Sequence, residues 1–201
     1  MRNLPCTPAI VGSGLLVAIL AASGCDAVLT TSQLPAVRED GMLGAWKDMG
    51  RPGTPPDPEP VLFKYVDGEY WLGSANQFTK GEASPFTLAR VGKVLIAQSP
   101  GKTQCDDFVS QKGKPCWSLN RLELLKDHMS WYDFDSARMA KDSFSGTLNV
   151  AHSLHRQRKE NGNFENALLI SAEIPQLQTF LETYVKRSKV FRLTGRLERM
   201  H

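Results

Sequence analysis

Residues 61–75 read VLFKYVDGEYWLGSA, two apolar-rich runs joined by Asp67-Gly68. Both residues of that dipeptide tolerate the positive φ angles that a two-residue turn requires. Runs of this length, rich in aromatic and β-branched residues, favour extended strands. The stretch therefore predicts an antiparallel β-hairpin.

Two further stretches repeat this arrangement, each with a short polar or glycine-containing link between apolar runs. They are residues 86–98, with the turn at Gly92-Lys93, and residues 117–134, with the turn at 126–128. Successive hairpins with short links predict a mainly β fold, an antiparallel meander that closes into a barrel or forms a sandwich.

The end of the chain, residues 190–200, alternates in the way that a half-buried strand does. One face holds Phe191, Leu193, Gly195 and Leu197, and the other holds Arg192, Thr194, Arg196 and Glu198. A final strand of this kind can pair with the first one, which we place at 42–48, and so remove both open sheet edges. This pattern favours the barrel.

One helix is predicted before that last strand. Ser171 is a candidate N-cap and Pro175 fits the first turn, where its missing N–H costs little. The helix has an apolar stripe at helical spacing that we assign to core packing: Ile174, Leu177, Leu181, Tyr184 and Val185. Residues 148–154 and 167–170 are candidate short strands around a charged turn at 156–163, while 136–146 stays ambiguous.

The Gly44-Ala45-Trp46 sequence in the first strand, the hairpins and the arginines of the last strand resemble the lipocalin pattern. In lipocalins a G-x-W tryptophan plugs the closed end of an eight-stranded barrel, beneath an arginine of the last strand. The resemblance gives Trp46 that role, with Arg192, Arg196 and Arg199 as equal candidates for its partner. The alternative is that Trp46 is an ordinary core residue.

The N-terminus has one basic residue, Arg2, and then an uncharged apolar run from 10 to 22. This is typical of a secretory signal. The residues that follow, up to Gly24-Cys25, resemble the lipobox of bacterial lipoproteins, which implies cleavage before Cys25 and acylation of its thiol. An uncleaved transmembrane anchor is the alternative, but the strongest apolar core, 15–22, is shorter than the about 20 residues that span a bilayer.

The chain is thus divided into a signal peptide (1–24), a tether (25–40) and a lipocalin-like barrel domain (41–201). Over roughly 42–200 it resembles a loose set of small bacterial lipoproteins of unknown function. This resemblance places the domain in the periplasm, anchored by lipid, and Asp26 favours the inner membrane over the outer one. Five prolines within 50–60 indicate a rigid loop.

Two cysteines remain in the domain once Cys6 is removed with the signal and Cys25 carries lipid. Because the periplasm is oxidising, we predict a disulfide between Cys105 and Cys116. A redox or metal pair lacks the C-x-x-C spacing or the nearby histidines that it would need.

The sequence carries none of the common catalytic motifs, so we predict no enzyme, no metal and no cofactor. His152 and His155 would face opposite ways in a strand, while Asp133 and Asp135 would share a face at a solvated strand end. A formal net charge of +3 is too small to indicate nucleic-acid binding. The remaining hypotheses are binding of a small apolar ligand in the barrel or, alternatively, a scaffold or accessory subunit that docks another envelope protein.

Overall fold

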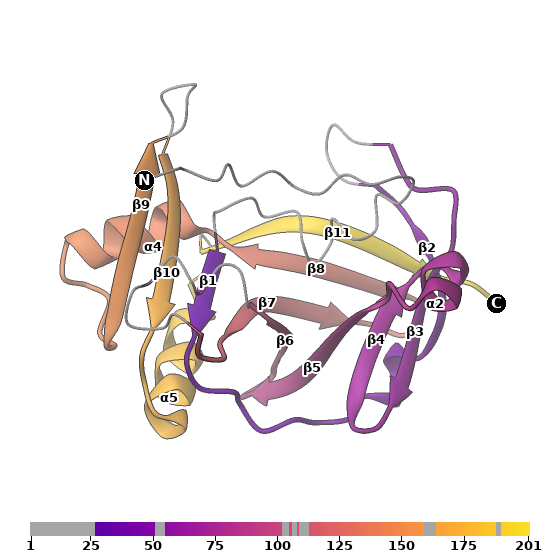
Figure 1. Cartoon of the computed structure of the whole chain (residues 1–201), viewed down its shortest axis with the longest axis horizontal. Helices are drawn as coiled ribbons and strands as arrows, with labels where there is room; N and C mark the ends of the chain where they lie inside the picture. Colours follow the sequence, from indigo (N-terminus) through magenta and orange to yellow (C-terminus); the bar gives the residue numbers. More distant parts are fainter. Residues whose placement is uncertain are drawn as a thin grey trace.

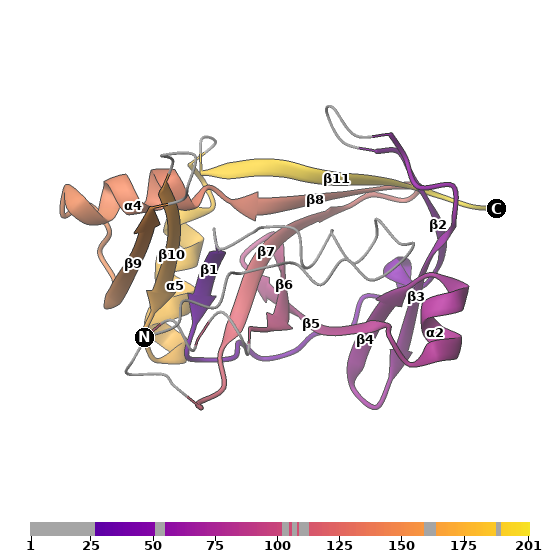
Figure 2. The ribbon, with the colours of Figure 1, turned by 45° about the horizontal axis from the view of Figure 1, so that its top comes forward.

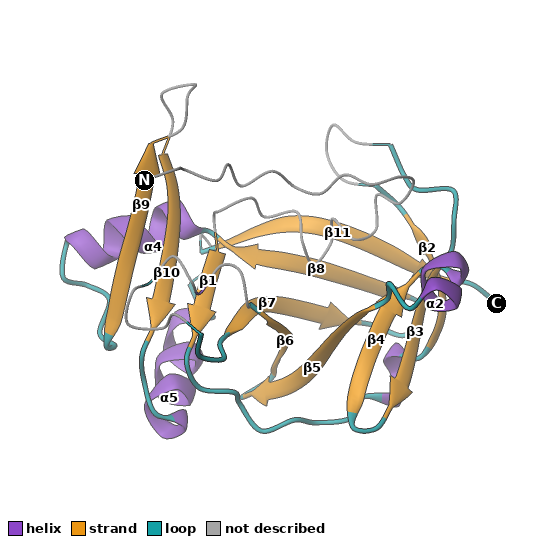
Figure 3. Ribbon diagram, viewed as in Figure 1, coloured by secondary structure: helices purple, strands orange, loops and turns teal. Residues whose placement is uncertain are grey.

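The computed structural model describes residues 27–50, 55–101, 105, 108, 113–158, 164–187 and 190–201. The predicted signal peptide, Cys25 and Asp26 lie outside these ranges. The described strands are β1 (Ala27–Thr30), β2 (Gly44–Asp48), β3 (Val61–Val66), β4 (Glu69–Gly73), β5 (Ser84–Val91), β6 (Val94–Pro100), β7 (Trp117–Leu124), β8 (His128–Phe134), β9 (His152–Arg158), β10 (Phe164–Ile170) and β11 (Phe191–Arg199). The helices are α2 (Ala75–Lys80), α4 (Ser136–Phe144) and α5 (Ile174–Tyr184), with a 3-10 turn η1 (Asp40–Met42) (Figure 3).

Eight of the strands form a closed antiparallel barrel, as the hairpin series predicts. The strands follow one another from β2 to β8, β6 pairs with β7, and β11 fills the gap between β8 and β2 (Figure 1). The last strand therefore pairs with the strand predicted at 42–48, and α5 precedes it. The mainly β barrel with a helix before its last strand is confirmed.

A smaller sheet and two helices extend from one end of the barrel (Figure 2). β1 pairs antiparallel with the start of β7 and parallel with β10, which in turn pairs with β9. A second hydrophobic core lies between these elements and the outer face of the barrel. It includes Ala89, Ile96, Leu119, Phe134, Met139, Leu168, Leu177 and Leu181.

The tether predicted at 25–40 is wrong for its described part, because β1 and a bridge from Val37 to Leu88 belong to the folded domain. Val28, Leu29 and Thr30 are all buried. A strand covered on both faces has no alternation of apolar and polar residues, so the stretch lacked the usual sign of a strand.

The helices differ from the predictions made from the sequence in three places. α5 begins at Ile174 with Glu173 as its N-cap, so the capping role expected of Ser171 is wrong, while Pro175 does lie in the first turn. The ambiguous stretch at 136–146 is α4, capped by Asp135, whose carboxylate accepts a bond from the Arg138 N–H. The unforeseen α2 begins with a capping box formed by Ser74 and Gln77.

In the β9–β10 pair, β9 is shifted from its predicted position and β10 is longer than predicted. β9 covers 152–158 where a strand was expected at 148–154, so the charged turn expected at 156–163 is wrong for its first three residues. Residues 159–163 lie outside the described ranges. β10 begins three residues before the apolar run at 167.

Tyr184 makes the stability of the second core depend on pH in the alkaline range. Its hydroxyl donates to Asp142 Oδ2 over 2.7 Å, and burial together with this carboxylate raises the pKa of Tyr184 above its ordinary value of 10.0. Because the folded state disfavours the phenolate, stability is fully present below pH 10 and is lost as the pH rises above it.

We therefore expect the free energy of unfolding to fall from about pH 10 upward in the wild type, and to fall less in Tyr184→Phe. Urea denaturation at a series of pH values measures this slope, with circular dichroism at pH 8 as the control for native structure. Equal slopes in both proteins would contradict the assignment.

Candidate functional sites

Trp46 closes one end of the barrel, and Arg199 is its partner. The guanidinium carbon of Arg199 lies 4.3 Å from the centroid of the fully buried Trp46 ring, and the indole N–H donates to the Met42 carbonyl over 3.0 Å. Arg199 also donates to the carbonyls of Gly41, Leu43 and Lys126. One side chain thus ties η1, β2 and the β7–β8 turn to the end of β11.

Gly44 has a backbone reason to precede this tryptophan. Its φ is +115°, a region that residues with a side chain rarely adopt. A Cβ atom built on Gly44 would lie 3.7 Å from Nη1 of Arg199. The G-x-W residues and the arginine therefore belong to one local arrangement.

The other two candidate arginines lie elsewhere. Arg196 is exposed, and Arg192 lies 3.9 Å from Asp133 Oδ2. Strand alternation distinguishes them, since Arg199 follows Gly195 and Leu197 on the inward side of β11. The sequence alone therefore contains the alternation that distinguishes Arg199 from Arg196.

The predicted disulfide joins Cys105 and Cys116. Both cysteines are buried, in a small core with Leu29 of β1 and Leu169 of β10. The disulfide therefore holds the start of β7 against the smaller sheet formed by β1, β10 and β9. Both cysteines lie deeper in the protein than the surface loop that the sequence between them suggests.

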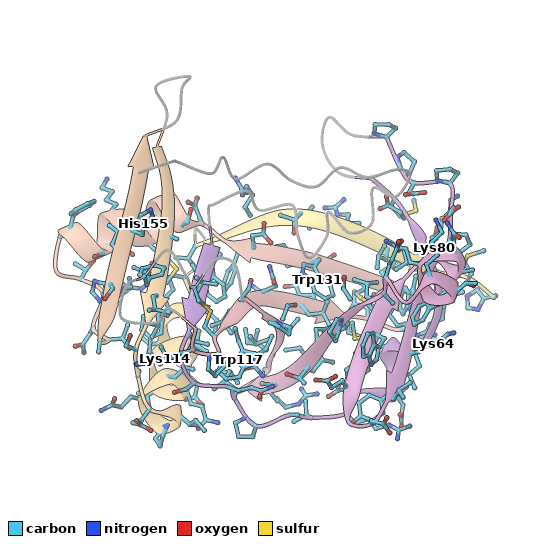
Figure 4. The ribbon with its side chains drawn as sticks, in the orientation of Figure 1. Lys64, Lys80, Lys114, Trp117, Trp131 and His155 are labelled. Carbon is cyan, nitrogen blue, oxygen red and sulfur yellow. A yellow bond between two sulfur atoms is a disulfide. The ribbon has the colours of Figure 1, made fainter. Side chains whose placement is uncertain are left out.

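Aromatic rings fill the barrel from the closed end to its middle. Trp46, Phe63, Phe86 and Trp131 follow one another in edge-on contacts, with ring centroids 6.5, 6.2 and 5.7 Å apart. Tyr70 stacks on Phe86 at 5.4 Å, and all five side chains are at most 2% exposed. Figure 4 places Trp131 amid the barrel strands. This part of the barrel is a packed core.

The opposite end of the barrel interior is polar. Asn120 Nδ2 donates to Asp133 Oδ1 over 2.7 Å, and the Thr194 hydroxyl lies 3.4 Å from the same oxygen and 3.2 Å from the Trp131 carbonyl. Asn120 and Asp133 are 5% and 7% exposed. The sequence predicts that Asp133 and Asp135 share one face at a strand end, but the structure separates them. Asp133 faces the polar cluster with Asn120 and Thr194, while Asp135 caps α4.

The two histidines of β9 do not form a site together. His152 bonds the Ser143 hydroxyl and the Val150 carbonyl, each over 2.7 Å, whereas the ring of His155 contacts Phe108. Ser143 lies at the C-terminal end of α4, where the helix dipole opposes the negative charge that a reacting serine develops. The contact therefore fits a link between α4 and β9 better than a nucleophile and its base. No group of three potential metal ligands occurs among the described residues.

β9 leaves one sheet edge open. It is the only described strand with a single neighbour, since every other strand pairs on both sides. Its seven residues all pair with β10 on one side, and its sequence, HSLHRQR, has no acidic residue.

Comparison of the chain with protein-family models, with curated proteins and with solved structures finds no match in any of the three. None of the helices in the described ranges is long and apolar enough to cross a membrane.

The contacts of Arg199 lead to a stability prediction. Arg199→Ala removes the packing on Trp46 and the bonds to three carbonyls, so we expect a loss of about 2–4 kcal/mol. Arg196→Ala, on the outward face of the same strand, should change stability by at most about 0.5 kcal/mol. Urea denaturation followed by tryptophan fluorescence compares the two; equal losses would mean that Arg199 does not hold the closed end.

Proposed function

We propose that this chain is a lipid-anchored protein of the cell envelope, facing the periplasm, that docks another envelope protein through the open edge of β9. It acts as a scaffold or accessory subunit and catalyses no reaction. The observation that carries this proposal is the unpaired edge of β9, the one described strand with a single neighbour.

The packed barrel favours docking over the binding of a small apolar ligand. A barrel that takes such a ligand needs empty apolar space, and here the apolar part of the interior is occupied by Trp46, Phe63, Phe86 and Trp131. A ligand there would have to displace side chains that are already packed against one another.

An open strand edge offers backbone N–H and C=O groups to an added strand. β9 has seven residues, about the length that strand addition uses, and Ser153 near its start is exposed. The β9 sequence, HSLHRQR, has no acidic residue, which favours a partner strand that carries Asp or Glu.

The proposed anchor would bring this edge close to the membrane. If Cys25 carries the lipid, only Asp26 separates it from Ala27, the first residue of β1. β9 lies two strands from β1, a distance of roughly 10 Å at the ordinary strand spacing. The partner is therefore expected to be a membrane protein or another anchored protein.

Lipidation is tested by labelling cells that express the full chain with radioactive palmitate. We expect the label in the wild type and in Cys6→Ser, because Cys6 leaves with the signal, and its complete loss in Cys25→Ser. Label that persists in Cys25→Ser would refute the anchor.

Docking is tested with a photo-crosslinking amino acid placed in the full chain in its own host. At Ser153 we expect one dominant crosslinked protein, close in amount to the chain itself. Lys64, exposed on β3 between two neighbouring strands, is the matched control and should give no such product. The absence of a product at Ser153, or the same product at both positions, would overturn the proposal.

A further inference from the structure

Helix α4 crosses the smaller sheet and continues past its last strand. Met139 of α4 shares the second core with Leu168 of β10. Near the C-terminal end of α4, the Ser143 hydroxyl lies 2.7 Å from Nε2 of His152, the first residue of β9. In both Figure 1 and Figure 2 the end of α4 extends beyond the open side of β9. A strand added to that edge would therefore run alongside the end of α4.

The last residue of α4 is Phe144, which directly follows Ser143. Phe144 has interactions within the chain, yet it is 69% exposed, the highest value of any large apolar residue in the described ranges. Ser136 and Ala140, at intervals of four residues before it on the same row of the helix, are buried. Burial along this row thus ends where the helix leaves the sheet.

Exposure alone does not make Phe144 a binding residue. Single exposed apolar side chains are common on protein surfaces, and Leu125, 67% exposed in the β7–β8 turn, is another in this chain. Phe144 differs from Leu125 in its place beside an open strand edge, where backbone groups remain for an added strand to bond.

The hydrogen bonds at the start of β9 indicate which backbone groups those are. The Ser171 N–H donates to the Ala151 carbonyl over 2.9 Å, so Ala151 directs its backbone groups toward the chain that continues β10. Successive residues of an antiparallel strand direct these groups to alternate sides. His152 and Leu154 therefore present their N–H and C=O groups to the open edge.

The side chains of the same two residues point to the face of the sheet that carries α4. His152 reaches Ser143, and Leu154 packs against the second core, to which Met139 belongs. Residues directly opposite each other on neighbouring strands share a face. A partner residue opposite His152 or Leu154 would therefore point toward α4, where Phe144 offers it an apolar surface.

We propose that Phe144 determines the specificity of the β9 edge, and that the segment which adds to this edge carries a large apolar side chain opposite His152 or Leu154. This inference rests on the docking proposed above and names the chemistry of the partner segment. A charged residue at that position would lose hydration against the Phe144 ring without gaining a bond.

The affinity of docking in Phe144 variants tests this inference. The full chain carries the photo-crosslinking amino acid at Ser153 in its own host, and the membranes are solubilised in detergent and diluted in series before irradiation. The concentration that gives half of the maximal product then reports the affinity. Phe144→Ala should weaken it roughly tenfold, and Phe144→Leu, which keeps an apolar side chain, should restore most of it.

Leu125→Ala is the matched control, because it removes an equally exposed apolar side chain far from β9, and it should leave the affinity unchanged. The crosslinking amino acid in place of Phe144 should capture the same protein as at Ser153, and in place of Leu125 it should not. This second measurement decides the question even if Phe144→Ala does not fold.

Equal affinities of the wild type and Phe144→Ala, or crosslinks from position 144 to lipid alone, would overturn this inference and leave docking at β9 standing. If the wild type gives no product at Ser153, docking itself is refuted, and this inference with it.

Discussion

The pairing of β2 with β11 is the constraint on which the barrel depends. The ladder is short, with Asp48, Lys47 and Trp46 opposite Leu197, Glu198 and Arg199. It joins segments about 150 residues apart in the chain, as in the bond from Arg199 to the Leu43 carbonyl, so the loop that it closes is entropically costly. The ring contact and the carbonyl bonds of Arg199 concentrate additional stabilisation at this seam.

The start of β7 lets one barrel carry a second sheet. Trp117 and Ser118 pair with β6 on one side and with β1 on the other, whereas residues 120–122 pair with β6 and β8. β7 thus changes one neighbour along its length, and the disulfide at Cys116 fixes the chain just before that change. The packing of the smaller sheet and of helices α4 and α5 follows from this change of neighbour.

The sequence predicted those parts of the fold that local chemistry determines. Asp67-Gly68 and the alternation of residues 190–200 were enough for a hairpin and for the closing strand. The single apolar face expected of Phe191, Leu193, Gly195 and Leu197 is wrong, however. A bulge between Leu193 and Gly195 shifts the register, so Phe191 packs in the second core while Leu197 packs in the barrel core. β1 escaped prediction because a strand buried on both faces has no alternation, and α2 was missed although Ser74 and Gln77 have capping-box spacing. The choice of Arg199 over Arg196 could have been made from strand parity alone.

The polar cluster was beyond sequence reasoning for a different physical reason. Asn120, Asp133 and Thr194 lie on three strands, and only the register between those strands decides that their side chains meet. A shift of one residue would turn the whole set outward. In the same way, nothing in HSLHRQR says that β9 is an edge, because that property belongs to the order of the strands.

The barrel therefore has two unlike ends, which differ in how completely their polar groups are paired within the chain. At the closed end every strong contact of Trp46 and Arg199 is satisfied within the chain, as expected of a group whose purpose is to hold the fold. At the other end, Ser99 and Asn120 keep bonding capacity that an apolar core of the same shape would not need to bury. The open edge of β9 likewise carries a risk of aggregation that a folded domain gains nothing from by itself. Binding is expected at features that cost stability or solubility, such as the edge of β9. At such places the chain's own residues do not use all of their hydrogen-bonding groups, so another molecule can bond to them.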